Sequence, residues 1–174
     1  MTELAPDFEL ANVGPGPDPC SLRDLAADNE FVVLLFQRDF YCTNCREQIQ
    51  DVKERYGEFR ERDAIVASVL PEDRERAAEW QSSYDLPYPL LADPEAVASD
   101  AYDQPVRFGI LGRFSDFLGR MPEVVVVDCR DGPPTVAWSY AGESTFDRPT
   151  IDDILAELDR LREAAPAEGS PRNG

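Results

Sequence analysis

Runs of apolar residues along the chain indicate the strands of one sheet. Three runs are continuously apolar and rich in β-branched or aromatic residues, which is typical of strands covered on both faces. They lie at residues 31–36, 64–70 and 123–128. Shorter extended segments are expected at residues 8–10, 89–92 and 135–140. A turn at Asp131-Gly132 makes the last of these a hairpin partner of the third long run.

Apolar residues spaced three and four apart predict the longer helices. One helix is expected from about Cys42 to Arg62, and another begins at residues 71–73. A last helix is capped by Thr150 and carries a regular apolar stripe, made of Ile151, Ile154, Leu155, Leu158 and Leu161. We expect this stripe to belong to the core.

Capping signals predict two short helices. Ser21 with Asp24 three residues later fits a capping box, which opens a helix through Ala27. Asp93 followed by Pro94 fits an N-cap with proline in the first turn. Strands and helices therefore alternate first, and a hairpin and a helix follow. This order predicts the α/β class, with a central mixed sheet flanked by helices as in the thioredoxin fold.

The chain has the size of one domain. It has 174 residues, and 43% of them are hydrophobic, enough for a single buried core. We expect one thioredoxin-like domain over residues 1–163. Residues 164–174 are rich in Ala, Pro and Gly and are expected to form a disordered C-terminal tail.

The charge of the chain excludes several classes of partner. There are 35 Asp and Glu against 17 Lys and Arg, a net charge of −18, so nucleic acid is not an expected partner. No apolar stretch is long enough to span a bilayer, no basic amphipathic helix is present, and the N-terminus lacks a signal peptide. These features predict a cytoplasmic protein. Lys53 is the only lysine, and a dispersed acidic surface of this kind resembles the proteins of extreme halophiles.

The cysteine and histidine counts narrow the chemistry. The chain has four cysteines and no histidine, which removes Ser-His and Cys-His catalysis and the metal sites that contain histidine. Cysteine redox chemistry and a four-thiolate metal site remain. The metal site needs Cys20 and Cys129, which are isolated and do not form a second CxxC pair. These two are expected to be packing residues.

Cys42 and Cys45 form a CxxC motif between a buried strand and a helix. A thiolate at a helix N-terminus faces unpaired N–H groups and the positive end of the helix dipole, which lower its pKa. Two intervening residues let the second cysteine resolve a mixed disulfide on the first. Arg38 and Arg46 flank the motif and are expected to stabilise the thiolate. Two inert structural thiols are the alternative at this position.

Several segments together resemble landmarks of the peroxiredoxin (AhpC/TSA, redoxin) branch of the thioredoxin superfamily. The resemblance extends from Pro6 to about Arg162. The segments are residues 6–10, 21–25, 31–36, 89–93 and 124–128, together with Cys42-Thr43-Asn44-Cys45-Arg46. This resemblance implies a thioredoxin-like fold with a peroxiredoxin-type N-terminal extension, thiol redox chemistry and no bound cofactor.

Alignment with the peroxiredoxin motif implies one set of roles for the residues around the CxxC pair. On that motif Cys45 takes the peroxidatic position, Cys42 replaces the threonine and Thr43 replaces the proline. The family arginine falls at Pro122, and Arg120 stands two residues early. The altered loop leaves the peroxidase activity open.

The thioredoxin motif gives a different assignment. There Cys42 attacks, Cys45 resolves and Tyr41 stands in place of a tryptophan. Pro122 takes the position of the cis-proline, which implies a cis peptide bond before it. Thioredoxin's buried aspartate falls at Phe36. Glu123 and Asp39 are the candidates to replace this aspartate as proton acceptor.

The prediction for function is a thiol-disulfide oxidoreductase that cycles Cys42 and Cys45 between dithiol and disulfide. Cys42 is the expected attacker on disulfides, whereas Cys45 is the expected sulfenate former if the substrate is a peroxide. The expected partner is a thiol reductant or a disulfide-bearing protein. A non-enzymatic redox sensor or binding module of the same fold is the alternative. The oligomeric state stays open.

Overall fold

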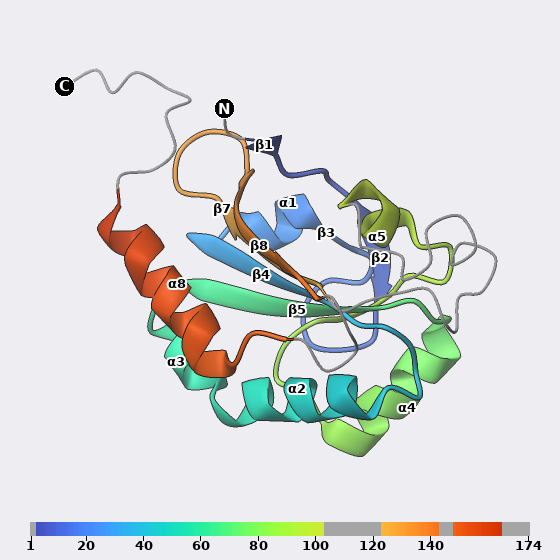
Figure 1. Cartoon of the computed structure of the whole chain (residues 1–174). Coiled ribbons are helices and arrows are strands. Elements are labelled where there is room, and N and C mark those ends of the chain that lie inside the picture. Colours follow the sequence, from blue (N-terminus) through green and yellow to red (C-terminus); the bar gives the residue numbers. More distant parts are fainter. Residues whose placement is uncertain (1–2, 103–122, 143–147, 165–174) are drawn as a thin grey trace.

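A computed structural model of the chain describes residues 3–102, 123–142 and 148–164. Their strands are β1 (Glu3–Leu4), β2 (Glu9–Asn12), β3 (Cys20–Ser21), β4 (Phe31–Phe36), β5 (Ala64–Leu70), β6 (Leu90–Ala92), β7 (Glu123–Asp128) and β8 (Thr135–Ala141). Among the described residues they form one eight-stranded sheet in the order β1-β8-β7-β4-β5-β6-β2-β3 (Figure 1). The sheet is mixed, because β4 runs parallel to β5 and antiparallel to β7. The predicted α/β class is confirmed.

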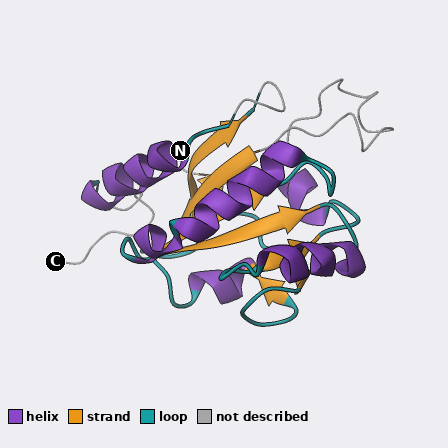
Figure 2. Cartoon of the chain, turned by 90° about the horizontal axis from the view of Figure 1, so that it is seen from below, coloured by secondary structure: helices purple, strands orange, loops and turns teal. Residues whose placement is uncertain are grey.

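The helices lie in two layers, one on each face of the sheet. Their bounds are α1 (Leu22–Ala26), α2 (Thr43–Glu54), α3 (Tyr56–Arg60), α4 (Arg74–Tyr84), α5 (Val97–Ala101) and α8 (Ile151–Glu163). Buried residues of α2, α3, α4 and α8 share one core cluster, and those of α1 and α5 share another. Figure 2, seen from below, shows helices of the first layer in front of the strands. Alternate residues of β4 enter the two cores, which explains why its whole sequence is apolar.

The helix predicted from Cys42 to Arg62 is two helices, and this prediction is corrected. Arg55 separates α2 from α3 with φ −112° and ψ 17°, outside the helical region. Its amide donates to the carbonyls of both Asp51 (3.2 Å) and Val52 (3.1 Å), which tightens the last turn of α2. Phe59 is still fully buried, so the apolar stripe survives the break.

The short helices differ in how well their capping signals predict them. The capping box predicted at Ser21 is present, and Thr150, predicted as a cap, forms a capping box with Asp153 as well. The helix expected directly after Asp93 begins at Val97 instead, since Ala96 adopts a left-handed conformation with φ 56°. The fully buried Asp93 carboxylate nevertheless accepts the amides of Val97 (2.8 Å) and Ala98 (3.0 Å). It therefore caps α5 from four residues upstream.

Two predictions concern residues that lie, wholly or mostly, outside the described part of the chain. Apart from Ala164, the predicted tail at residues 164–174 lies outside the described residues. The peptide bond before Pro122 also lies outside them. Where the chain is described, no helix is both long and apolar enough to cross a membrane.

Candidate functional site

The CxxC motif lies at the junction between the central strand β4 and the helix α2 that follows it. β4 ends at Phe36, a short loop follows, and α2 begins at Thr43 with Cys42 as its N-cap residue. The Cys45 amide donates to Cys42 Sγ at 3.2 Å, so a sulfur takes the place of the usual capping oxygen. Cys42 and Cys45 form a disulfide, with their Cα atoms 5.2 Å apart. The predicted position at a helix start is confirmed.

The two sulfurs differ in their access to solvent. Cys42 is 5% exposed, whereas Cys45 is completely buried. A bulky reactant therefore meets the Cys42 sulfur before the Cys45 sulfur.

N–H donors converge on both sulfurs. Arg148 Nη2 lies 3.3 Å from Cys42 Sγ and 3.1 Å from Cys45 Sγ. The Arg38 amide donates to Cys45 Sγ at 3.4 Å. Burial lowers the pKa of Arg148 to about 10, with the nearby Arg38 charge acting in the same direction. Arg148 is thus cationic at neutral pH, and its charge favours the thiolate when the disulfide opens.

Sequence reasoning missed Arg148. It stands 103 residues after Cys45 and two residues before the Thr150 cap of α8. Nothing in its local sequence distinguishes it from the other arginines. Its contact with the sulfurs forms only because the segment before α8 packs against the start of α2 in the folded chain. Gln48 was missed as well. This residue of α2 accepts a hydrogen bond from Arg148 Nη1 at 3.3 Å.

Arg46 was predicted to stabilise the thiolate, and the structure places its guanidinium on the preceding loop. Nε and Nη2 donate to the Phe40 carbonyl at 3.0 and 2.7 Å. The guanidinium also lies over the Phe40 ring at 5.0 Å and the Trp80 ring at 5.8 Å. Arg46 therefore holds the loop that precedes the disulfide.

Two of the remaining predicted residues, Tyr41 and Thr43, lie next to Cys42 in the chain. Tyr41 is 60% exposed beside Cys42, and its hydroxyl accepts a hydrogen bond from Arg76 at 2.9 Å. Thr43 is exposed in the first turn of α2. Arg120 and Pro122 lie outside the described residues. Their roles stay predictions.

The two candidate proton acceptors occupy different positions. Asp39 is buried in the loop, where its carboxylate accepts the Tyr41 amide at 2.7 Å and lies 3.4 Å from Arg38 Nε. Glu123 is buried at the start of β7, directly opposite Phe36. Asp39 is therefore engaged in shaping the loop, while Glu123 lies on β7 beside the end of β4, the strand that leads to the disulfide.

The other cysteines lie on the opposite face of the sheet. Cys20 and Cys129 pack in the core beneath α1 and α5, whereas the disulfide belongs to the core beneath α2. Burial raises the pKa of Cys20 to about 11 and that of Cys129 to about 12. The described residues include all four cysteines, and they contain no group of ligands able to hold a metal ion. A four-thiolate site is incompatible with this division.

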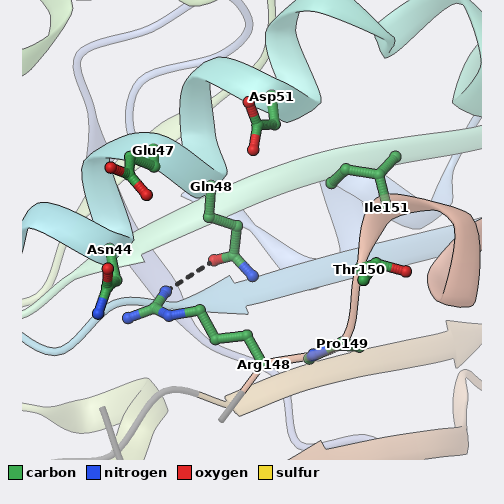
Figure 3. A pocket seen from close by; sticks show the side chains of 8 residues that line it. All are labelled: Asn44, Glu47, Gln48, Asp51, Arg148, Pro149, Thr150 and Ile151. Atoms are coloured by element: carbon green, nitrogen blue, oxygen red, sulfur yellow. Dashed lines mark hydrogen bonds between the residues drawn. The ribbon is translucent and has the colours of Figure 1, made fainter. Parts of the chain in front are cut away.

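A pocket of about 200 Å³ lies between α2 and the segment from Arg148 to Ile151 (Figure 3). One wall is α2 from Asn44 to Asp51, and the other is the segment that leads into α8. Its lining residues are Asn44, Glu47, Gln48, Asp51, Arg148, Pro149, Thr150 and Ile151. Arg148 thus connects the pocket, which it lines, with the disulfide, whose two sulfurs it contacts.

Known proteins resemble this chain in sequence and in structure. It is 28% identical to "Peroxiredoxin Bcp" of Bacillus subtilis over 101 residues, which are 58% of this chain and 62% of the relative. The match thus covers less than two thirds of the relative's length. The crystal structure of peroxidoxin BcpB from Mycobacterium tuberculosis superposes with a TM-score of 0.75 at 22% identity, covering 92% of this chain and 97% of that one.

A third similar protein is the bacterioferritin comigratory protein of Xanthomonas campestris. Its structure superposes with a TM-score of 0.70 at 16% identity and covers 88% of this chain and 91% of that one. At these identities the structural matches show the thioredoxin-like fold. A model of the AhpC/TSA family matches residues 1–130, about three quarters of the sequence. The chain therefore belongs to the AhpC/TSA family.

Proposed function

We propose that this protein is a thiol-dependent oxidoreductase that cycles Cys42 and Cys45 between dithiol and disulfide. The observation that carries the proposal is the disulfide at the start of α2, where Arg148 donates to both sulfurs. A cation and a helix N-terminus stabilise thiolates, so they lower the free energy of the reduced form. Membership of the AhpC/TSA family supports the same class of chemistry.

Disulfide exchange begins at the more exposed sulfur. The Cys42 thiolate attacks a substrate disulfide, one substrate sulfur leaves as a thiolate, and a mixed disulfide forms on Cys42. Cys45 then attacks Cys42, which releases the second substrate sulfur and forms the Cys42–Cys45 disulfide. The substrate gains two electrons and two protons, and the protein loses them.

Peroxide reduction is a second candidate, because the similar Xanthomonas campestris protein is described by its alkyl peroxide reduction activity. Here the Cys45 thiolate attacks the O–O bond, releases an alcohol or water and becomes a sulfenic acid. Cys42 attacks that sulfur, water leaves, and the same disulfide forms. The Arg38 amide and Arg148 lie at Cys45 Sγ and stabilise its thiolate.

We also propose a cellular setting. A dithiol that must be reduced after each turnover fits a reducing cytosol, with a thiol reductant as the electron donor. The charge of −18 and the single lysine fit a cytosol of high salt concentration. The unit that performs this chemistry is one domain, residues 1–163.

The test compares peroxide and disulfide reduction by the reduced protein in molar KCl. Wild type, Cys42→Ser and Cys45→Ser are assayed for the initial rate of hydrogen peroxide consumption and for the reduction of a protein disulfide. Rapid peroxide consumption that only Cys45→Ser abolishes assigns a peroxidase. Slow consumption by all three proteins, with disulfide reduction lost in Cys42→Ser, assigns a disulfide reductant.

Cys129→Ser is the matched control, because it removes a thiol from the other face of the sheet. It is expected to retain both rates. If wild type shows neither activity, the enzymatic proposal is wrong and a redox sensor or binding module is the better description.

A further inference from the structure

The pocket that Arg148 lines is small, and charged, polar and apolar side chains all contribute to its walls. Its volume of about 200 Å³ is below the range of roughly 300–1,000 Å³ typical of sites for drug-sized ligands. It therefore fits one amino-acid unit and is too small for a folded peptide segment. Figure 3 shows the side chains of Glu47, Gln48 and Asp51 along α2, with Arg148 and Ile151 facing them.

Gln48 provides an unused hydrogen-bond donor. The residue is 7% exposed, and its Oε1 accepts Arg148 Nη1 at 3.3 Å. Its Nε2 is buried and has no hydrogen-bond partner among the described residues. In Figure 3 this nitrogen points away from Arg148, into the gap between α2 and the segment that begins α8. A buried unsatisfied donor is unfavourable, so a ligand that supplies an acceptor oxygen there is stabilised.

Charges of both signs line the same space. Arg148 supplies a cation at the end of the pocket nearest the sulfurs. Glu47 and Asp51 supply two carboxylates from successive turns of α2. The Glu47 charge acts on Arg148, which shows that the two are near each other. The pocket thus offers donors to a carboxylate and acceptors to an ammonium group.

We propose that this pocket binds the α-amino-acid end of a low-molecular-weight thiol, which is the reductant of the Cys42–Cys45 disulfide. The ligand carboxylate lies against Gln48 Nε2 and Arg148, and its ammonium group lies against Glu47 and Asp51. The proposal rests on the proposed function and names the electron donor of that cycle.

The reaction uses two molecules of the small thiol. The first thiolate attacks Cys42 Sγ, the Cys42–Cys45 bond breaks, and Cys45 leaves as a thiolate held by Arg148. The second thiolate attacks the small-molecule sulfur of the mixed disulfide and releases the Cys42 thiolate. The two protons of the small thiols end on the protein dithiol. The products are reduced protein and one small-molecule disulfide.

The test measures the rate at which four thiols reduce the oxidised full-length protein. L-cysteine has both charged groups, cysteamine lacks the carboxylate, 3-mercaptopropionate lacks the ammonium group, and dithiothreitol lacks both. The extent of reduction is monitored by alkylating the newly formed thiols and measuring the mass of the protein by mass spectrometry. Rates are corrected for the thiolate fraction and nucleophilicity of each reagent. We expect L-cysteine to exceed cysteamine and 3-mercaptopropionate by about tenfold, as charge-assisted hydrogen bonds of typical strength predict.

Variants test the acidic wall. The double variant Glu47→Gln/Asp51→Asn is expected to lower the rate ratio of L-cysteine to 3-mercaptopropionate by about tenfold. The ratio cancels the general effect of removing negative charge near an attacking thiolate. Glu79→Gln is the matched control, because it removes an exposed charge from α4 away from the pocket. It is expected to leave the ratio unchanged.

The outcomes separate the two proposals. If dithiothreitol reduces the disulfide but L-cysteine has no advantage in wild type, the pocket proposal is wrong and the proposed function stands. The same holds if the double variant keeps the wild-type ratio, or if only a protein dithiol reduces the disulfide rapidly. If dithiothreitol-reduced protein reduces neither peroxide nor disulfide, both proposals fall.

Discussion

Arg148 places a positive charge on a pair of sulfurs in a strongly acidic protein. Its Nη2 lies within 3.3 Å of both Sγ atoms, and burial shields this contact from solvent. Electrostatic interactions strengthen where water is excluded, so this one cation outweighs more distant surface carboxylates. The charge acts on the reduced form, because a thiolate is an anion and a disulfide is neutral.

Replacing this charge changes the titration of the reduced protein. In Arg148→Gln the pKa of the reactive thiol is expected to rise by about one unit, since an opposite charge at this distance lowers a pKa by about 1–3 units. The midpoint of the pH profile for iodoacetamide alkylation then moves upward. The disulfide also becomes harder to reduce, so its reduction potential becomes more negative. Arg23→Gln, at an 88% exposed side chain, is the control, and an unchanged midpoint in Arg148→Gln contradicts the prediction.

At the scale of elements, the start of one helix determines where the disulfide lies, and the start of another determines where Arg148 lies. Cys42 is the N-cap of α2. The capping box of α8 begins at Thr150, where Oγ1 accepts the Asp153 amide at 3.0 Å, two residues after Arg148. The box of α1 has the same geometry, with Ser21 Oγ accepting the Asp24 amide at 3.0 Å.

Removing each capping box in turn gives two matched variants for comparison. Thr150→Ala and Ser21→Ala are each expected to lower the free energy of unfolding by about 1 kcal/mol, as typical cap losses do, measured by urea denaturation. Only Thr150→Ala is also expected to slow disulfide reduction by dithiothreitol, because fraying of the first turn of α8 displaces Arg148. Equal reduction rates in the two variants show that the cap does not position this arginine.

At the scale of the whole molecule, like charges oppose the compact state. A net charge of −18 on 174 residues favours expansion unless counterions screen it. Nearly all of the cations are arginines, and several of them pair with carboxylates across elements, as Arg62 of the α3–β5 turn does with Asp159 of α8 at 2.8 Å. Such exposed pairs add little stability, so salt is the larger influence.

Salt is therefore expected to stabilise the protein. The free energy of unfolding rises between about 0.1 M and about 1 M KCl, while the Debye length falls from about 10 Å to about 3 Å. The rise is smaller in a variant with four exposed glutamates changed to lysine: Glu61→Lys, Glu75→Lys, Glu79→Lys and Glu95→Lys. Urea denaturation at each salt concentration measures both. An equal rise in the two proteins assigns the effect to salt acting on apolar burial.

The predictability of each element follows from the range of the interactions that form it. β4 and the apolar stripe of α8 were predicted correctly, because the spacing of apolar residues within each element indicates which of its residues are buried. The break at Arg55 was missed, because the apolar stripe continues across it to Phe59. The late start of α5 was missed, because Asp93 caps it across a left-handed residue, Ala96.

The sequence by itself determined the α/β order of elements and the position of Cys42 and Cys45 at a helix start, because both depend on residues close together in the chain. Only the tertiary structure decided which arginine meets the sulfurs. It also decided that Gln48 keeps an unpartnered donor beside a pocket. Arg148 and Cys45 are 103 residues apart, and their contact depends on how α8 packs beneath the sheet. The spacing of residues within one segment of the sequence does not predict a contact with a distant segment.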